Sequence, residues 1–141
     1  MIIKQLSVFL QNKTGRLTEL TRTLSESGIN MTAFSIADTA DYGIVRFIVP
    51  QPEEALRILK EKGFSVNTTD VVCLIVPNEP GGLYRALQVL SDNEVPIEYM
   101  YAFASESGAS VVIRSESNAQ VIDVLQANKI QLMRASEIYN L

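Results

Sequence analysis

The sequence predicts an α+β fold made of two ferredoxin-like βαββαβ units in tandem, each an antiparallel sheet with helices on one face. The first observation is a repeated motif: Asn-Lys-Thr-Gly-Arg-Leu at 12–17 returns 66 residues later as Asn-Glu-Pro-Gly-Gly-Leu at 78–83. The second is that an apolar run precedes each copy and a helical pattern follows it. We therefore divide the chain into units at 1–69 and 70–141.

In the first half, helical spacing of Leu17, Leu20 and Leu24 predicts a helix that Gly28 ends. Pro52 opens a second helix, since proline and acidic residues suit a helix start. Segments rich in β-branched residues before and between the helices read as strands. The predicted elements are a strand at 2–11, a helix at 15–27, a strand at 30–39, a turn at 38–43, a strand at 44–49, a helix from 52 to 63 and a strand at 64–70.

The second half repeats this order with its own residues. Leu83, Leu87 and Leu90 share a helical face, and Pro96 prevents that helix from continuing. The predicted elements are a strand at 71–77, a helix at 81–93, a strand at 97–105, a turn at 106–108, a strand at 109–114, a helix at 118–127 and a strand at 130–135.

Composition narrows the classes of function. The chain has 141 residues, 47% of them apolar, which is enough for a sizeable core. A formal charge of −4 and a pI near 4.8 argue against nucleic acid as a partner. The sequence offers neither a membrane span nor a signal peptide, so we expect a cytoplasmic protein with no membrane partner. The single Cys73 lies in an apolar run and is expected to be buried and inert.

Each copy of the motif falls between a strand and a helix, where unpaired backbone N–H groups can bind an anion. Two βαββαβ units with Asn-x-x-Gly-x-Leu at this turn, and Gly-Ile-Asn-Met at 28–31 in the first unit, resemble the ACT domain family. The resemblance covers the whole chain. It implies a regulatory module without catalytic activity that binds a small ligand, most often an amino acid, at the interface between two ACT units.

In that family the loop of one unit commonly faces the start of the second strand of its neighbour. The resemblance therefore implies ligand-binding residues in both loops and beside both second strands: Asn12, Lys13, Thr14, Gly15, Arg16, Leu17, Ile29, Asn30, Met31, Asn78, Glu79, Pro80, Gly81, Gly82, Leu83 and Ile97.

The chemistry of these residues agrees with an amino acid ligand. Helix N–H groups can donate hydrogen bonds to the carboxylate, and an asparagine side chain offers both a donor and an acceptor. Apolar neighbours such as Leu17 or Leu83 can face the ligand's side chain. Asn30 aligns with Pro96, which has no polar side chain and no N–H, so the two sites are unequal. If the units pair as those of the family do, the better-equipped site joins the loop at 78–83 to Asn30.

Catalytic residues are scarce. The chain has no histidine and one cysteine, and neither loop has the pattern of a nucleotide site, so no enzyme activity, metal or cofactor is expected. Two alternatives stay open: an interaction subunit that docks on an amino-acid metabolic enzyme through its open sheet faces and Tyr99 and Tyr101, or a small enzyme such as an acylphosphatase using Arg16. A homodimer is a further possible assembly, and the identity of the amino acid is left open.

Overall fold

Strands from each half of the chain pair into antiparallel sheets in the computed structural model, which describes residues 1–38, 41–106 and 108–141. The first half forms β1 (Ile3–Gln11), α1 (Arg16–Glu26), β2 (Ala33–Asp38), β3 (Tyr42–Ile48) and α2 (Pro52–Glu61), followed by β4 (Ser65–Val76). The second half forms α3 (Gly82–Asp92), β5 (Tyr99–Ser105), β6 (Gly108–Arg114), α4 (Asn118–Ala127), β7 (Gln131–Met133) and α5 (Ala135–Tyr139).

The chain folds into two compact units whose members are not simply the two halves. The first unit comprises Lys4–Thr69 together with Ile138–Leu141, and the second comprises Asp70–Glu137 together with Met1–Ile3. Each unit thus receives a short segment from the far end of the chain. In the first unit, the backbone N–H of Lys4 donates to the hydroxyl of Tyr139 at 2.9 Å.

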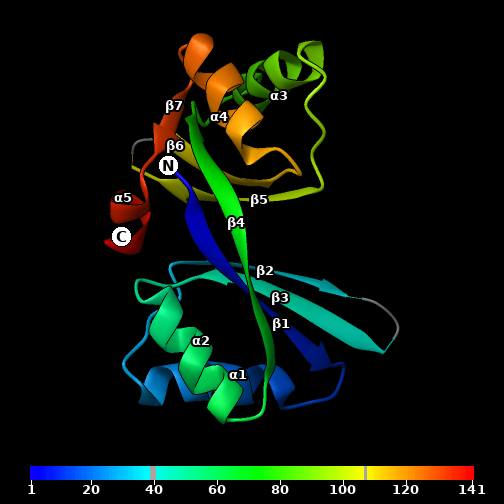
Figure 1. Cartoon of the computed structure of the whole chain (residues 1–141), viewed down its shortest axis with the longest axis vertical. Coiled ribbons are helices and arrows are strands. Elements are labelled where there is room, and N and C mark those ends of the chain that lie inside the picture. The colour runs from blue at the N-terminus through cyan, green and yellow to red at the C-terminus, as the bar shows by residue number, and fades with distance from the viewer. Residues whose placement is uncertain (39–40, 107) are drawn as a thin grey trace. The chain divides into compact units, whose positions relative to one another are not determined.

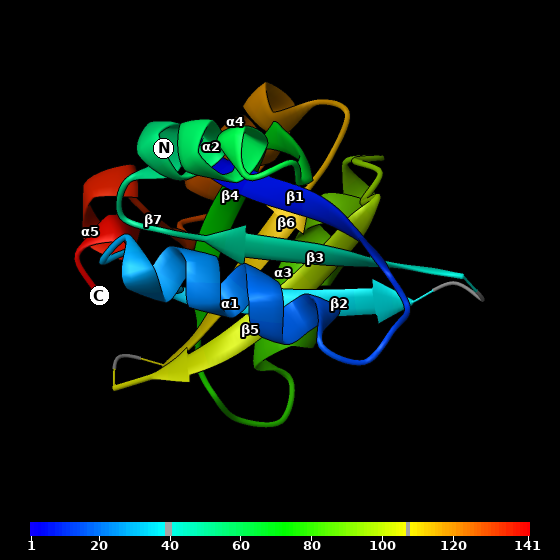
Figure 2. The ribbon, with the colours of Figure 1, turned by 90° about the horizontal axis from the view of Figure 1, so that it is seen from below.

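The sheet of the first unit has the strand order β2-β3-β1-β4. Leu6 lies opposite Phe47 in the β1–β3 pair, and Phe47 lies opposite Phe34 in the β2–β3 pair. Helices α1 and α2 lie together on one face of this sheet (Figures 1 and 2). Their buried residues, which include Leu20, Leu24 and Leu59, close a core with the inward side chains of the strands.

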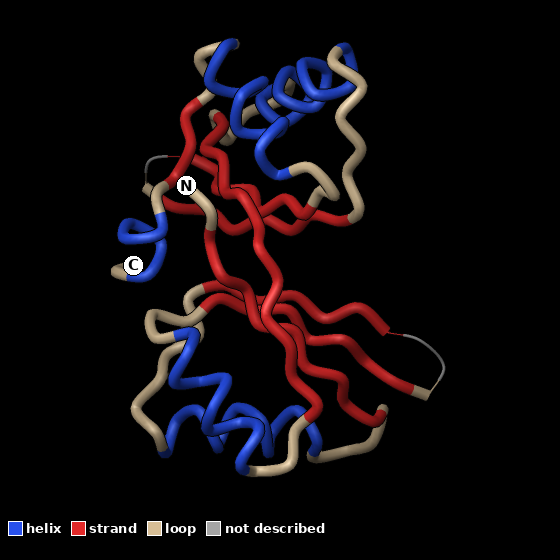
Figure 3. The backbone as a smooth tube through the Cα atoms, in the orientation of Figure 1, coloured by secondary structure: helices blue, strands red, loops and turns tan. Residues whose placement is uncertain are grey.

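The second unit uses the end of β4 as its central strand, in the order β7-β4-β6-β5. Leu74 lies opposite Val111 on β6 and opposite Leu132 on β7. Helices α3 and α4 cover one face, and Figure 3 shows helices on one side of the strands in each unit. The core between them contains Leu90 and Leu125, both fully buried. The predicted fold class is therefore confirmed.

The observed elements differ from the predicted ones in three places. The strands predicted at 64–70 and 71–77 are one continuous strand, β4. The strand predicted from residue 30 begins at Ala33, because the N–H of Ile29 still donates to the carbonyl of Leu24 and closes the end of α1. Helix α5, over part of the predicted last strand, was not predicted. The turns predicted at 38–43 and 106–108 include residues 39, 40 and 107, which lie outside the described residues.

Candidate functional site

The first loop, 12–15, connects β1 to α1 at one edge of the first unit. Gly15 precedes the helix with φ +91°, a conformation that side-chain-bearing residues rarely adopt. Its carbonyl accepts a hydrogen bond from the N–H of Glu19 at 2.9 Å, and the N–H of Asn12 donates to the carbonyl of Asp41 at 3.0 Å. The loop is therefore fixed to the β2–β3 connection on one side and to α1 on the other.

A pocket of about 180 Å³, which we call the loop pocket, lies beside this loop. Sheet register explains its composition: Leu10 lies opposite Gly43, and Gly43 lies opposite Asp38, so the end of β2 comes close to the end of β1. The pocket is lined by Leu10, Gln11, Asn12, Lys13, Arg16, Leu17, Ile36, Asp38, Gly43 and Val45. It combines two cations, one carboxylate, polar amides and apolar side chains.

Arg16 is oriented by its neighbours. Its guanidinium forms an ion pair with Glu19 at 3.1 Å and donates to the side-chain oxygen of Gln11 at 3.5 Å. Both ends of the ion pair are more than 40% exposed, so the pair contributes little to stability. Its effect is to hold the guanidinium at the rim of the loop pocket.

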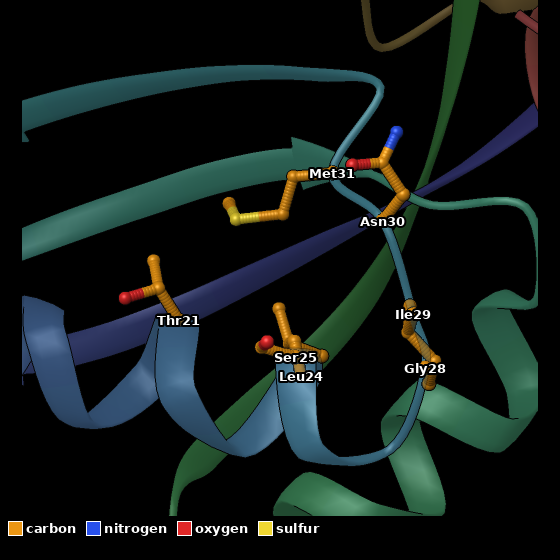
Figure 4. A pocket seen from close by; sticks show the side chains of 7 residues that line it. All are labelled: Thr21, Leu24, Ser25, Gly28, Ile29, Asn30 and Met31. Carbon is orange, nitrogen blue, oxygen red and sulfur yellow. The ribbon is translucent and has the colours of Figure 1, made fainter.

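Ile29, Asn30 and Met31 lie at the other end of α1, in a pocket of about 370 Å³ that we call the helix-end pocket (Figure 4). In this view the side chains of Thr21 and Ser25 point from α1 toward that of Met31, whereas Asn30 points away from the helix. The 11 residues of α1 span about 16 Å. The first unit therefore separates the predicted residues into two pockets rather than joining them.

The second loop, 77–81, connects β4 to α3 and repeats the backbone hydrogen bonds of the first. The N–H of Glu79 donates to the carbonyl of Pro77 at 2.9 Å, and the N–H of Gly82 donates to the carbonyl of Glu79 at 3.1 Å. A Cβ on Gly82 would collide with the carbonyl oxygen of Pro77, so the close approach needs glycine. Glu79 forms an ion pair with Arg85 at 3.2 Å.

The predicted site residues around the second loop differ in how exposed they are. Asn78, Glu79 and Pro80 are exposed, whereas Leu83 and Ile97 are half-buried and pack against the core of the second unit. The prediction that this loop and Asn30 form one site, at an interface between units, stays a prediction.

Cys73 is fully buried on β4. Burial raises the pKa of its thiol to about 12, and a hydrogen bond with the backbone of Val111 only partly offsets this effect. The thiol is therefore protonated at neutral pH, which makes it a poor nucleophile.

Six residues that line the loop pocket were missing from the predicted site, and Asp38 is the charged one among them. Asp38 was assigned to a solvated turn because it stands in a polar stretch between two strands. The order of the strands would have identified it, since a βαββαβ unit brings the end of its second strand to the same end of the sheet as its first strand-to-helix loop, with one strand between them.

Comparison with known families shows what class of protein this arrangement defines. The chain belongs to the ACT domain pair family, which it matches over residues 1–141. Membership of this family supports a regulatory ligand-binding role. Among the described residues, no helix combines the length and apolar composition that crossing a membrane requires.

Several solved structures are similar to this chain. It is similar to protein BT0572 from Bacteroides thetaiotaomicron, with 49% identity, a TM-score of 0.96 and coverage of 100% of this chain and 98% of that one. The fold also matches the regulatory subunit of aspartate kinase from Thermus thermophilus, with 18% identity, a TM-score of 0.65 and coverage of 88% and 91%. The fold also matches the regulatory subunit of aspartate kinase from Thermus flavus, with 16% identity, a TM-score of 0.62 and coverage of 90% of this chain and 94% of that one. No curated protein sequence matches the chain.

Proposed function

We propose that this protein is a non-catalytic regulatory module that binds a free amino acid. The observation that carries the proposal is the loop pocket, where Asp38 lies in the same lining as Lys13 and Arg16. A zwitterion needs both signs of charge close together, and this pocket offers both. A pocket built only for a phosphate or a carboxylate would not need an acidic residue.

The lining suggests how an amino acid would be held. The ligand carboxylate would face Lys13, Arg16 and the first N–H groups of α1, where the helix dipole favours negative charge. The ammonium would face Asp38. The apolar side chains of Leu17 and Ile36 would contact the ligand's side chain, and the volume of about 180 Å³ favours a compact one.

Regulation would follow from the elements that the ligand connects. The loop pocket draws on β1, α1, β2 and β3, so an occupied pocket links four elements of the first unit. A ligand that favours one conformation of these elements shifts the population toward it, and a partner that recognises this conformation detects the ligand.

Thermal unfolding with each of the twenty amino acids tests the proposal. A ligand at about 100 times its Kd adds about 2.7 kcal/mol, which raises the Tm of a chain this size by several degrees. Asp38→Asn should weaken binding by about 1–3 kcal/mol because the ammonium loses its charged partner. The matched control is Asp123→Asn, an exposed aspartate on α4.

No Tm shift with any amino acid, in protein shown to be folded, would refute the proposal. Equal affinity of wild type and Asp38→Asn would refute the assignment of the site. Asn30 and Asn78 do not line the loop pocket, so Asn30→Ala and Asn78→Ala should leave binding there unchanged. Weaker binding in either variant would instead support the ligand contacts that the family resemblance implies.

A second candidate function rests on a different observation. Phe34 and Ile36 lie on β2, which begins the strand order β2-β3-β1-β4, and their exposed fractions are 63% and 48%; that of Tyr42 on β3 is 51%. Exposed apolar side chains on an edge strand are typical of a surface that binds another protein. A metabolic enzyme or a second copy of the chain are the partners to consider.

Sedimentation equilibrium tests whether a second copy of the chain is the partner. A dimer that Phe34→Ser converts into a monomer would assign the surface to self-association. A wild-type chain that is monomeric at about 100 µM, where a Kd near 1 µM would give almost complete dimer, would exclude a second copy.

A further inference from the structure

The two units differ most clearly at one pocket beside the second loop. This pocket, of about 250 Å³, lies in the second unit and is lined by residues from the end of β4, the first turns of α3 and the turn between α4 and β7. We call it the cation pocket. Figure 1 labels these elements. The 66-residue spacing of the repeat identifies the equivalent position in the first unit for each residue that lines it.

Small residues on α3 line the pocket. Gly82 and Ala86 lie one helical turn apart, where the first unit has Arg16 and Leu20. Ala86 is shorter than Leu20, whereas the place of a Cβ on Gly82 is filled by the carbonyl oxygen of Pro77. The lining also includes the apolar side chains of Ile75 and Ile130, which can contact a hydrocarbon group.

The two cations that line the pocket stand at positions where the first unit has no cation. Arg85 occupies the position of Glu19, a reversal of charge, and Lys129 occupies the position of Gly63. Among the described residues that line the pocket, none is acidic. Arg85 forms an ion pair with Glu79 at 3.2 Å, but a guanidinium has five N–H donors and can bind Glu79 and a ligand anion together.

Lys129 has a backbone conformation that lysine rarely adopts. Its φ is +57°, and the equivalent Gly63 has φ +85°. The hydrogen bonds at the two helix ends are the same, since Lys129 and Gly63 each donate to the carbonyl three residues earlier, at 3.1 and 3.0 Å. Glycine fits this position without strain, and strained residues concentrate at functional sites. The second unit therefore carries a lysine at a position where backbone geometry favours glycine.

We propose that the cation pocket is a second ligand site, which binds a small organic anion without an ammonium group, such as a 2-oxo acid with a short branched side chain. Arg85 and Lys129 would bind the carboxylate, and the apolar residues of the lining would contact the side chain. An amino acid would bring its ammonium against two cations with no carboxylate in the lining, so this site would reject the class of ligand that suits the loop pocket.

The experiment compares two probes that differ at one group. Isothermal titration calorimetry with 4-methyl-2-oxopentanoate should give saturable binding, and leucine should bind the cation pocket at least about tenfold more weakly. Inorganic phosphate, which lacks the apolar group, should also bind at least tenfold more weakly. In ¹⁵N NMR spectra the oxo acid should shift the amides of Gly82 and Ile130, which line the pocket.

Variants identify the residues responsible. Lys129→Gly restores the residue of the first unit, so it should fold, and it should weaken oxo acid binding by about tenfold or more through loss of one charged contact. Arg85→Gln should have a similar effect. Glu94→Gly is the matched control, because it removes a side chain at the other left-handed position, φ +56°, without changing the pocket lining.

Asp38→Asn distinguishes the two proposals. It should weaken amino acid binding in the loop pocket and leave oxo acid binding in the cation pocket unchanged. The inference is overturned by absence of saturable oxo acid binding to folded wild type, by unchanged affinity in Lys129→Gly and Arg85→Gln, or by phosphate or leucine binding there as tightly as the oxo acid.

Discussion

Replacing Glu94 by glycine is expected to stabilise the protein. Glu94 follows α3 with φ +56°, and Gly28 follows α1 in the equivalent place with φ +70°. The hydrogen bonds agree as well: the N–H of Glu94 donates to Ser91 at 3.0 Å, and that of Gly28 donates to Ser25 at 3.0 Å. The two positions thus have the same backbone geometry, and only one of them has the residue that this geometry favours.

The expected magnitude follows from two opposing effects. Relief of the left-handed conformation is worth about 1–2 kcal/mol, and the greater freedom of glycine in the unfolded chain cancels about 0.4–1 kcal/mol of it. Glu94→Gly should therefore raise the free energy of unfolding by about 0.5–1 kcal/mol, and Gly28→Glu should lower it by a similar amount. No atom lies within 4 Å of a Cβ built on Gly28, so steric clash does not contribute.

Thermal unfolding followed by circular dichroism would measure both changes, with an expected Tm shift of about 2 °C in opposite directions. Urea unfolding with unchanged m-values would show that stability has changed without a change in the surface exposed on unfolding. Destabilisation by Glu94→Gly, or indifference to Gly28→Glu, would refute the reasoning that backbone conformation alone distinguishes the two positions.

Two further predictions concern β4. Burial raises the pKa of Cys73 from 9.0 to about 12, so its thiol adds stability that is present in full below pH 9 and is lost as pH rises toward 12, by about 1.4 kcal/mol per pH unit. Urea unfolding from pH 8 to 11 should show this extra slope in wild type but not in Cys73→Ala. Parallel profiles of the two proteins would contradict the prediction. Asn118→Ala should lower the free energy of unfolding by about 1–2 kcal/mol, because the Asn118 side chain donates to the carbonyl of Asp70 at 2.8 Å and accepts from the N–H of Ser115 at 3.3 Å. Asn128→Ala, which removes one exposed hydrogen bond to Val124, is the control, and an equal loss in both variants would argue against a special role for Asn118.

The fold was predictable because it rests on signals that repeat. Helical spacing of leucines and the duplicated loop motif each occur twice at the same interval, so a chance match at one copy is outweighed by the second. Helix α5 was not predicted because its five residues are too few to show a helical period. The continuity of β4 was not predicted because the polar stretch at 67–70, exposed at Asn67 and Thr68, resembles a break between strands, although β4 pairs as one strand.

The candidate site was less predictable. The motif directed attention to the loops, and Lys13 and Arg16 do line a pocket. Asp38 comes to the same pocket only through strand register, which no local pattern reveals. Lys129 and Arg85 lie 44 residues apart in the sequence, and neither belongs to a recognisable motif. Charges of this kind are identified by comparing the two folded units position by position.

The exchanged ends of the chain have a consequence for its synthesis and for its dissection. Met1–Ile3 belong to a unit whose other residues begin at Asp70, and Ile138–Leu141 belong to a unit whose other residues end at Thr69. Neither unit is therefore complete until the ribosome has made nearly the whole chain. A cut between residues 69 and 70 would give two fragments that each lack part of their own unit, so mixing the two fragments should restore more structure than either shows alone.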